Sequence, residues 1–139
     1  MLAVNLVGPF RLTKIVAGAM ALRGRGLVAH VSSDAAVAAY PRWGAYGVAK
    51  AAQDHLGRIL AAELEGTGVR VVSVDPGEMN TRMHADAIPD GDPATLADPE
   101  AVARRLATLI ARPEALAPNG GRVELVRVPD LAPAGEGRP

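Results

Sequence analysis

Two short apolar runs constrain the fold of this chain more than any other feature of its sequence. The segment LVAHV at residues 27–31 and the segment VRVVSV at residues 69–74 are rich in valine and almost continuously hydrophobic. Such runs are typical of parallel strands that are covered on both faces by helices. The sequence therefore predicts an α/β fold that is built on a parallel sheet.

The remaining periodic segments indicate helices and one more strand. Helical patterns occupy residues 2–23, 45–65 and 99–111, and residues 122–128 form the expected last strand. The apolar stripe of the first helix should consist of Leu6, Leu12, Ile15, Val16, Ala19 and Met20. The side of the second helix that faces the sheet should carry Leu56, Ile59, Leu60 and Leu64. Asp98 followed by Pro99 is typical of a helix start. We predict three parallel strands, ordered in space as in sequence, with helices on both faces.

The run WGAYGVAKAA places Tyr46 four residues before Lys50. This spacing brings a phenol and an ammonium to the same face of a helix. A phenol ordinarily loses its proton near pH 10, and a neighbouring cation favours the phenolate. The pair can therefore donate or accept a proton near neutral pH, as carbonyl reduction and alcohol oxidation require. Taken alone, it also fits an aromatic residue at a helix start beside a solvated lysine.

Further polar residues follow the two apolar runs. Ser33 lies just after the first run, thirteen residues before Tyr46. The second run leads into DPGEMNT, a turn that contains Pro76 and Gly77, with Thr81 four residues after the glycine. Ligand sites of open parallel sheets lie at the carboxyl ends of the strands. These residues are therefore candidates for one common site.

Together, the segments VNLVG, VSS, AYGVAK and DPGEMNT have an order and a spacing that resemble a known family. That family is the short-chain dehydrogenases/reductases of the classical type, and the resemblance is to their carboxyl-terminal half. It implies a partial Rossmann fold, a doubly wound parallel sheet, in residues 1–128, with an unpaired outer edge on the first strand because that strand's neighbour in the family is absent. The proline- and glycine-rich end at residues 129–139 is predicted to be a flexible tail. The resemblance also implies an NAD(P)-dependent oxidoreductase.

The resemblance assigns a role to each matching residue. It implies that Tyr46 is the general acid/base, that Ser33 hydrogen-bonds the reacting oxygen, and that Lys50 acts on the phenol and binds the nicotinamide ribose. The implied catalytic set is Asn5, Ser33, Tyr46 and Lys50. The residues implied in cofactor binding are Tyr46, Lys50, Pro76, Gly77 and Thr81.

The role of Asn5 also has a physical argument. Pro9 lies four residues later and has no amide hydrogen, so in a helix the Asn5 carbonyl loses its ordinary partner and can bind water. The resemblance implies that this carbonyl anchors a water in a proton relay to Lys50. The alternative is that Pro9 only marks a helix start near residue 9.

The glycine-rich turn with which the family binds the cofactor pyrophosphate is not found in this sequence. Neither RGRG at residues 23–26 nor NGG at residues 119–121 follows a strand and opens a helix, as that fingerprint requires. We expect Met1 to be an internal methionine of a longer reading frame, and the chain to be a catalytic-half fragment that is inactive alone. The choice between NAD and NADP stays open, because the residue that makes it would precede Met1.

Composition narrows the class of protein. Fifteen basic and fifteen acidic residues balance, and the chain has three histidines and no cysteine. This indicates neither a nucleic-acid surface nor disulfides, and it offers no metal ligands at recognisable spacing. No segment resembles a signal peptide or a membrane span. We expect a cytoplasmic protein that acts on a small carbonyl or alcohol compound.

Residues 77–97 show no steady periodicity. The resemblance implies that this segment is mobile and closes over the substrate, as long loops often do. Within or near it, an apolar substrate wall or simple packing onto the sheet would explain Met79, Met83, Ile88 and Trp43 equally well. His84 is a weaker candidate for substrate contact, and His30 and His55 are expected to be packing or surface residues.

Alternatives to a reductase remain. One is a non-catalytic remnant or association module that binds no cofactor. Another is a nucleotide-sugar epimerase of the extended branch, which shares the Tyr/Lys pair, although the short tail after Val128 and the PGEMNT turn argue against it. In relatives the first two helices form the main subunit interface, so we expect a homo-oligomer, and association or aggregation of the isolated chain.

Overall fold

A computed structural model describes residues 1–131 of the chain. Within them three strands form one parallel sheet: β1 (Gly26–Val31), β2 (Val69–Asp75) and β3 (Arg122–Glu124). Their order in the sheet is β1-β2-β3, so the predicted parallel sheet and the predicted order of its strands are confirmed. The outer edge of β1 has no strand partner among the described residues, as expected.

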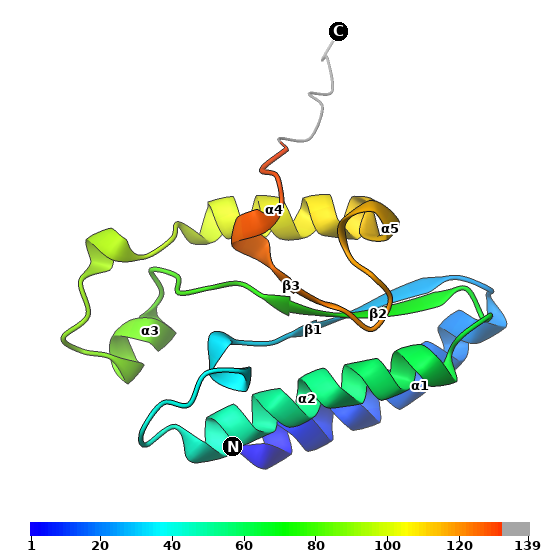
Figure 1. Cartoon of the computed structure of the whole chain (residues 1–139), viewed down its shortest axis with the longest axis horizontal. Coiled ribbons are helices and arrows are strands. Elements are labelled where there is room, and N and C mark those ends of the chain that lie inside the picture. Colours follow the sequence, from blue (N-terminus) through cyan, green and yellow to red (C-terminus); the bar gives the residue numbers. More distant parts are fainter. Residues whose placement is uncertain (132–139) are drawn as a thin grey trace, which may run out of the picture.

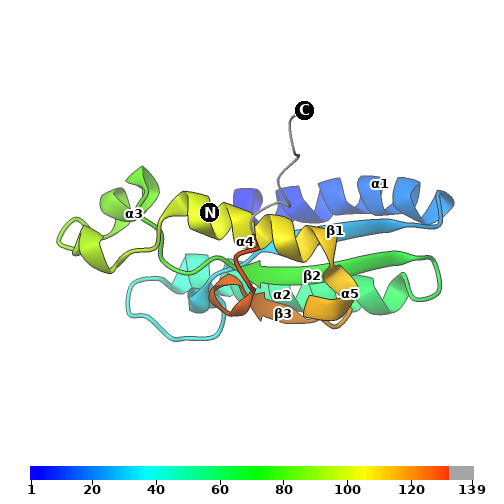
Figure 2. The ribbon, with the colours of Figure 1, turned by 90° about the horizontal axis from the view of Figure 1, so that it is seen from above.

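Three long helices cover the two faces of the sheet (Figure 1). Helices α1 (Gly8–Leu22) and α2 (Gly44–Glu63) lie on one face, and α4 (Pro99–Ala111) lies on the other. Seen from above, α1 runs along β1, whereas α2 lies beneath β2 and β3 (Figure 2). This is the predicted arrangement of helices on both faces.

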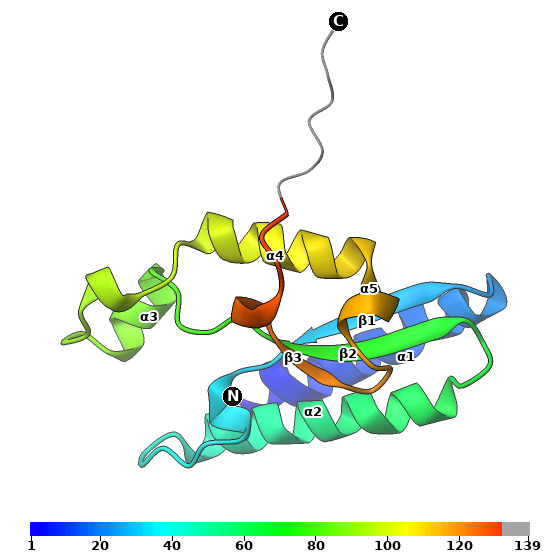
Figure 3. The same cartoon turned by 45° about the horizontal axis from the view of Figure 1, so that its top comes forward.

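Two short helices lie outside the segments for which helices are predicted. Helix α3 (Arg82–Ala87) interrupts the segment 77–97, for which the sequence shows no periodicity, and α5 (Pro113–Leu116) follows α4. Helix α3 and its connections extend beyond the carboxyl ends of the strands (Figure 3). That end of the sheet is where the candidate site residues gather.

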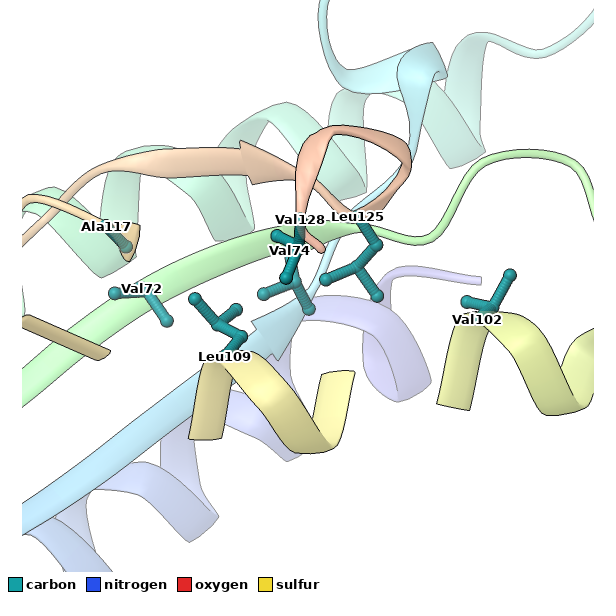
Figure 4. Packing of buried hydrophobic residues seen from close by; sticks show 7 residues of the cluster. All are labelled: Val72, Val74, Val102, Leu109, Ala117, Leu125 and Val128. Carbon is teal, nitrogen blue, oxygen red and sulfur yellow. The ribbon is translucent and has the colours of Figure 1, made fainter. Parts of the chain in front are cut away.

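The side chains of β2 alternate between two buried clusters. Val72 and Val74 contribute to the cluster beneath α4, whose other buried members are Val102, Leu109, Ala117, Leu125 and Val128 (Figure 4). Val71 belongs to the cluster on the opposite face, with Val28, Leu60 and Ala61. Because successive strand residues point to opposite faces, one central strand anchors the helices on both sides.

The contrast between Leu109 and Ile110 provides a test of this packing. Leu109 is fully buried, whereas its neighbour Ile110 is 53% exposed. We expect Leu109→Ala to lower the free energy of unfolding by about 2–5 kcal/mol, because it leaves a cavity. Ile110→Ala should lower it by less than about 1 kcal/mol. Urea unfolding followed by circular dichroism measures both, and similar losses would show that α4 does not pack through Leu109.

The last strand is shorter than the sequence predicts. β3 ends at Glu124, and a 3-10 turn at Leu125–Arg127 replaces the strand that was expected to reach Val128. Leu125 and Val128 are both buried beneath α4. Residues three apart point to opposite faces of a strand but to the same side of a 3-10 turn. The chain therefore leaves the strand in order to bury both side chains.

Helix α1 buries only part of the predicted stripe: Met20 packs against the cluster that contains Val71, and Val16 is half-buried. Leu12 and Ile15 are 62% and 74% exposed, whereas Thr13 and Ala17 are buried. The helix packs against the outer strand β1, so only a narrow side of it meets the sheet. That side contains Thr13, whose hydroxyl lies 3.0 Å from the ring of His30. An apolar side of α1 is left uncovered.

The predicted helix ends agree closely with the structure. Helix α2 was predicted at residues 45–65 and is found at Gly44–Glu63. Gly66, just beyond its end, has a φ of 76°. Asp98 accepts hydrogen bonds from the amides of Glu100 and Ala101, as a helix-capping residue does. Of the tail predicted at residues 129–139, residues 132–139 lie outside the described residues.

Candidate active site

The first turns of α2 bring Tyr46 and Lys50 to the same side of the helix. Lys50 Nζ lies 5.7 Å from the centroid of the Tyr46 ring. Trp43 also packs edge-on against the Tyr46 ring, with the ring centroids 5.6 Å apart. The spacing of four residues therefore places the phenol beside the ammonium, and an aromatic contact fixes the ring.

Lys50 is nearly buried, with 8% of its surface exposed. Its Nζ donates a hydrogen bond of 2.7 Å to the backbone carbonyl of Val31, at the end of β1. Burial lowers the pKa of the Lys50 ammonium, and the negative charge of Asp54 opposes this effect. An ammonium has three N–H donors, so the bond to Val31 leaves two for other acceptors.

Ser33 lies just past β1 and caps a 3-10 turn at Asp34–Ala36. Its Oγ accepts a hydrogen bond from the amide of Ala35 at 3.2 Å and donates one to Asp34 Oδ1 at 2.9 Å. The turn packs directly on α2, since a β-carbon at Gly47 would lie 2.9 Å from the Ala35 carbonyl oxygen. The glycine thus permits the close approach that brings Ser33 beside the start of α2.

The Pro76–Gly77 turn follows β2 at the same end of the sheet. Gly77 has a φ of 74°, a conformation that favours glycine, and its amide donates to Asp75 Oδ1 at 3.0 Å. Thr81 caps α3 by accepting a hydrogen bond from the amide of His84 at 3.3 Å. The hydroxyl of Thr81 is therefore engaged within its own loop.

Asn5 lies in a π-helical turn, Ala3–Val7, directly before α1. The amide of Gly8 bonds to a carbonyl five residues back, and Pro9 follows in the first turn of α1. The side-chain amide of Asn5 donates to the Met1 carbonyl at 3.1 Å. The presence of Pro9 predicts a break in the regular helical hydrogen bonding, and the structure shows this break as a wider, π-helical turn. Such turns are frequent at functional sites. This turn packs against α2, although the Asn5 side chain points back towards Met1.

An ion network that the sequence does not predict connects the end of β1, the end of β2 and helix α2. From the start of β3, Arg122 Nη2 lies 2.6 Å from Asp75 Oδ2 and donates to the Ser33 carbonyl at 3.0 Å. Arg122 Nε lies 3.3 Å from an oxygen of Asp54, one helical turn after Lys50. Arg122 therefore ties the ends of β1 and β2 to α2.

Comparison with known proteins establishes the family. A family model described as short chain dehydrogenase matches residues 1–91. The chain belongs to the short-chain dehydrogenase family. An uncharacterized oxidoreductase of Thermotoga maritima is 42% identical over 76 residues, which are 55% of this chain and 30% of the relative. The inactive 2-(S)-hydroxypropyl-CoM dehydrogenase 2 of Xanthobacter autotrophicus is 38% identical over 106 residues, 76% of this chain and 44% of the relative.

Solved structures of short-chain dehydrogenases have the same fold. One from Pseudomonas syringae has a TM-score of 0.79 at 32% identity, and the match covers 89% of this chain and 50% of the chain in that structure. One from Escherichia coli CFT073, complexed with NADPH, has a TM-score of 0.75 at 25% identity, and the match covers 89% of this chain and 51% of the chain in that structure. The chain thus spans about half the length of these structures. The predicted family and the predicted Rossmann-type fold are confirmed.

In this member of the family, the segment after Gly77 is partly packed and partly exposed. Met79 pairs with Ala97 and packs against the cluster beneath α4, whereas Met83 is 73% exposed. His84 Nε2 lies 3.7 Å from a carboxylate oxygen of Glu78. The position of Met79 therefore supports the interpretation that it packs onto the sheet. It does not support a substrate wall that Met79 and Met83 form together.

The described residues contain neither a cluster of metal ligands nor a helix that could cross a membrane. In residues 1–131, no group of three or more histidine, aspartate or glutamate side chains could hold a metal ion. In the same range, every helix is too short or too polar to cross a membrane.

His30 makes the stability of this protein depend on pH. It is buried in β1, and burial lowers its pKa, although the charge of Asp54 and the backbone of Gln53 oppose this. The unfolded chain therefore binds a proton more readily than the folded protein, so this contribution to stability is complete above about pH 6.5 and is lost as the pH falls below it.

Urea unfolding at about pH 7.5 and about pH 5.5 tests this linkage. We expect the wild-type chain to be less stable at the lower pH, and His30→Gln to lose less stability between the two conditions. His55→Gln, on the exposed side of α2, is the control and should behave as the wild type does. A His30→Gln variant that retained the whole pH dependence would exclude His30 as its source.

Proposed function

We propose that this chain carries the catalytic half of an NAD(P)-dependent oxidoreductase that interconverts a carbonyl compound and an alcohol. One observation carries the proposal: α2 places Tyr46 beside the nearly buried Lys50, and Lys50 is bonded to the end of the strand that leads to Ser33. A phenol beside an ammonium is suited to general acid–base catalysis at a reacting oxygen. Membership of the family supports the same reaction class.

Each residue of the candidate site has a proposed task. Tyr46 gives a proton to the carbonyl oxygen or removes one from the alcohol, and Ser33 hydrogen-bonds the same oxygen and keeps it in line. Lys50 supplies positive charge beside the phenol. The backbone carbonyl of Asn5 holds a water for a proton relay to Lys50. A bound nicotinamide cofactor would supply or accept the hydride.

The residues present fit the nicotinamide end of such a cofactor. Lys50 keeps two N–H donors for ribose hydroxyls. At the Pro76–Gly77 turn the backbone is open, since no atom of the described residues other than 76–78 lies within 4 Å of the place of a Gly77 β-carbon. Thr81 follows in the same loop as a further proposed contact. The sequence contains no glycine-rich turn for the pyrophosphate, so we propose tight binding only together with an amino-terminal half, with NAD or NADP as the cofactor.

A fusion protein tests the proposal. We define the fused enzyme as the full 139-residue chain joined behind the amino-terminal half of the Thermotoga maritima relative. With a panel of aldehydes and ketones, we expect it to oxidise NADH or NADPH, measured by the loss of cofactor absorbance. The chain alone should neither turn over substrate nor bind cofactor tightly. A folded fused enzyme that is inactive, beside an active full-length relative, would contradict the proposed function.

We further propose that α1 and α2 form a homo-oligomer interface. Their exposed apolar side chains include Leu12, Ile15 and Leu22 on α1 and Val48 and Ile59 on α2. Exposed apolar side chains on both helices favour association, so the isolated chain should self-associate in sedimentation experiments. A monodisperse monomer that unfolds cooperatively would contradict this. Association without activity in the fused enzyme would favour the alternative, a non-catalytic association module.

The proposed partner is a small carbonyl or alcohol compound, and the proposed location is the cytoplasm. The equal numbers of basic and acidic residues argue against a nucleic acid as the partner, because nucleic-acid surfaces carry an excess of positive charge. Fractionation of cells that express the protein at its natural level would measure the location.

A further inference from the structure

The Lys50 ammonium is nearly buried, and its hydrogen-bond partner is uncharged. Its Nζ donates a hydrogen bond of 2.7 Å to the Val31 carbonyl, and 8% of the residue is exposed. Among residues 1–131, no carboxylate forms an ion pair with this ammonium. A buried cation is costly unless a negative charge balances it. A charge further away therefore has to supply the balance for Lys50.

Asp54 lies one helical turn after Lys50, on the same side of α2. Its side chain is 9% exposed, and its Oδ2 lies 3.3 Å from Arg122 Nε. Its Oδ1 is buried and has no hydrogen-bond partner among the described residues. The negative charge of Asp54 is therefore held inside the protein, one turn from Lys50, and one of its oxygens is not engaged by a donor.

Arg122 does not balance the negative charge around it. This single guanidinium lies 2.6 Å from Asp75, 3.3 Å from Asp54 and 3.8 Å from Glu124. Water screens the charge of Glu124, whose side chain is 41% exposed. Two nearly buried carboxylates then remain for one cation. A surplus of negative charge is thus left next to the turn of α2 that carries Lys50.

The other ionisable groups in this region do not supply the balance. His30 on β1 is uncharged at neutral pH, because burial lowers its pKa. The Tyr46 phenol has no charge until it loses its proton. Arg58, one turn beyond Asp54, is a second cation, but it is exposed to water. Asp54 is the residue of the described chain whose charge favours the ammonium form of Lys50.

We propose that Asp54 is a positioning residue that keeps the positive charge on Lys50, and that Arg122 fixes the Asp54 carboxylate for this task. The inference rests on the proposed function, in which the charge acts on the phenol of Tyr46. Burial lowers the pKa of Lys50, and the charge of Asp54 raises it. Without that charge, Lys50 becomes neutral at a lower pH, and the phenol loses the cation beside it.

The chain allows a direct measurement of this charge, because it contains only two lysines, Lys14 and Lys50. In the full 139-residue chain with isotopically labelled lysine, the NMR signals of each side chain move as its ammonium loses a proton. Lys14 is exposed on α1 and is the internal control. All samples carry Tyr46→Phe, because a phenol that titrates in the same pH range would couple to Lys50.

In this background, Asp54→Asn removes the charge with almost no change of shape, and its amide oxygen can still accept a hydrogen bond from Arg122. Below the midpoint of the Lys50 titration, we expect the uncharged fraction of Lys50 to increase by about three- to tenfold at a given pH. Lys14 should titrate as before. Glu63→Gln, which removes an exposed negative charge from the same helix, should leave Lys50 unchanged. Where Asp54→Asn fails to fold, Asp54→Ser removes the same charge and leaves room for water beside Arg122.

Turnover of the fused enzyme, with Tyr46 present, links this charge to catalysis. The ratio of wild-type to Asp54→Asn turnover should grow to roughly threefold or more as the pH rises from about 6 to about 9, because the variant loses the Lys50 charge first. Asp54→Glu keeps the negative charge and should keep the wild-type pH profile. A carboxylate that served only the fold would lower turnover by the same factor at every pH.

An unchanged Lys50 titration in Asp54→Asn overturns the inference, and so does a turnover ratio that is the same at every pH. A shifted titration together with a ratio that grows with pH supports it. An inactive wild-type fused enzyme contradicts the proposed function alone, because the Lys50 titration in the 139-residue chain still decides whether Asp54 holds the charge.

Discussion

Replacement of Tyr46 by phenylalanine is expected to lower the turnover number of the fused enzyme by roughly 10²–10⁴-fold, the usual contribution of a positioned acid–base group. The variant loses only the phenol oxygen, the group proposed to give or take the proton. The ring keeps its edge-on contact with Trp43. The free energy of unfolding should therefore change by less than about 1 kcal/mol. Steady-state kinetics with whichever of NADH and NADPH the fused enzyme oxidises measures turnover, and urea unfolding measures stability separately.

A charge-neutralising change near the end of the same helix serves as the control. Glu63 is exposed, and Glu63→Gln should leave turnover unchanged. Near-normal turnover in Tyr46→Phe would remove Tyr46 from its proposed role. A loss of turnover accompanied by an equal loss of stability would show that the hydroxyl matters for the fold and not for proton transfer.

Replacement of Arg122 by alanine is expected to lower the free energy of unfolding by about 3–5 kcal/mol. The side chains of Asp54 and Asp75 are each only 9% exposed, and Arg122 is the cation that contacts both. Without the guanidinium, two nearly buried carboxylates lose their counter-charge. The Ser33 carbonyl also loses a hydrogen bond. Urea unfolding of the chain at neutral pH measures the effect.

A surface arginine provides the comparison. Arg82 forms an ion pair with Asp86 on α3, and these side chains are 94% and 72% exposed. Arg82→Ala should change the free energy of unfolding by less than about 0.5 kcal/mol, because water screens such pairs. If Arg122→Ala had an effect as small as Arg82→Ala, the network would not contribute to stability as described.

Local sequence was sufficient to predict most of the secondary structure. The valine-rich runs become β1 and β2 because a nearly continuous apolar segment suits a strand that is covered on both faces. The Asp98 side chain accepts hydrogen bonds from amides two and three residues later. A short stretch of sequence was therefore enough to predict where α4 begins. The contact between Tyr46 and Lys50 follows from one helical turn.

The predictions that were wrong depended on packing between distant segments. Leu12 and Ile15 of α1 are exposed because α1 lies mainly along the outer strand β1, so the sheet covers only one side of the helix. The strand predicted to reach Val128 ends at Glu124 because Leu125 and Val128 must both enter the cluster beneath α4. Neither outcome can be read from hydrophobic periodicity, which does not say how much of a helix or strand its neighbours cover.

The sequence by itself determined the positions of the strands and the long helices, and the family to which the chain belongs, because these depend on short-range patterns and ordered motifs. Only the tertiary structure decided which charges meet. Arg122 reaches Asp54 and Asp75 across 68 and 47 positions of the chain. Likewise, only the folded loop shows that the Asp34 carboxylate accepts hydrogen bonds from the hydroxyls of both Ser33 and Tyr40.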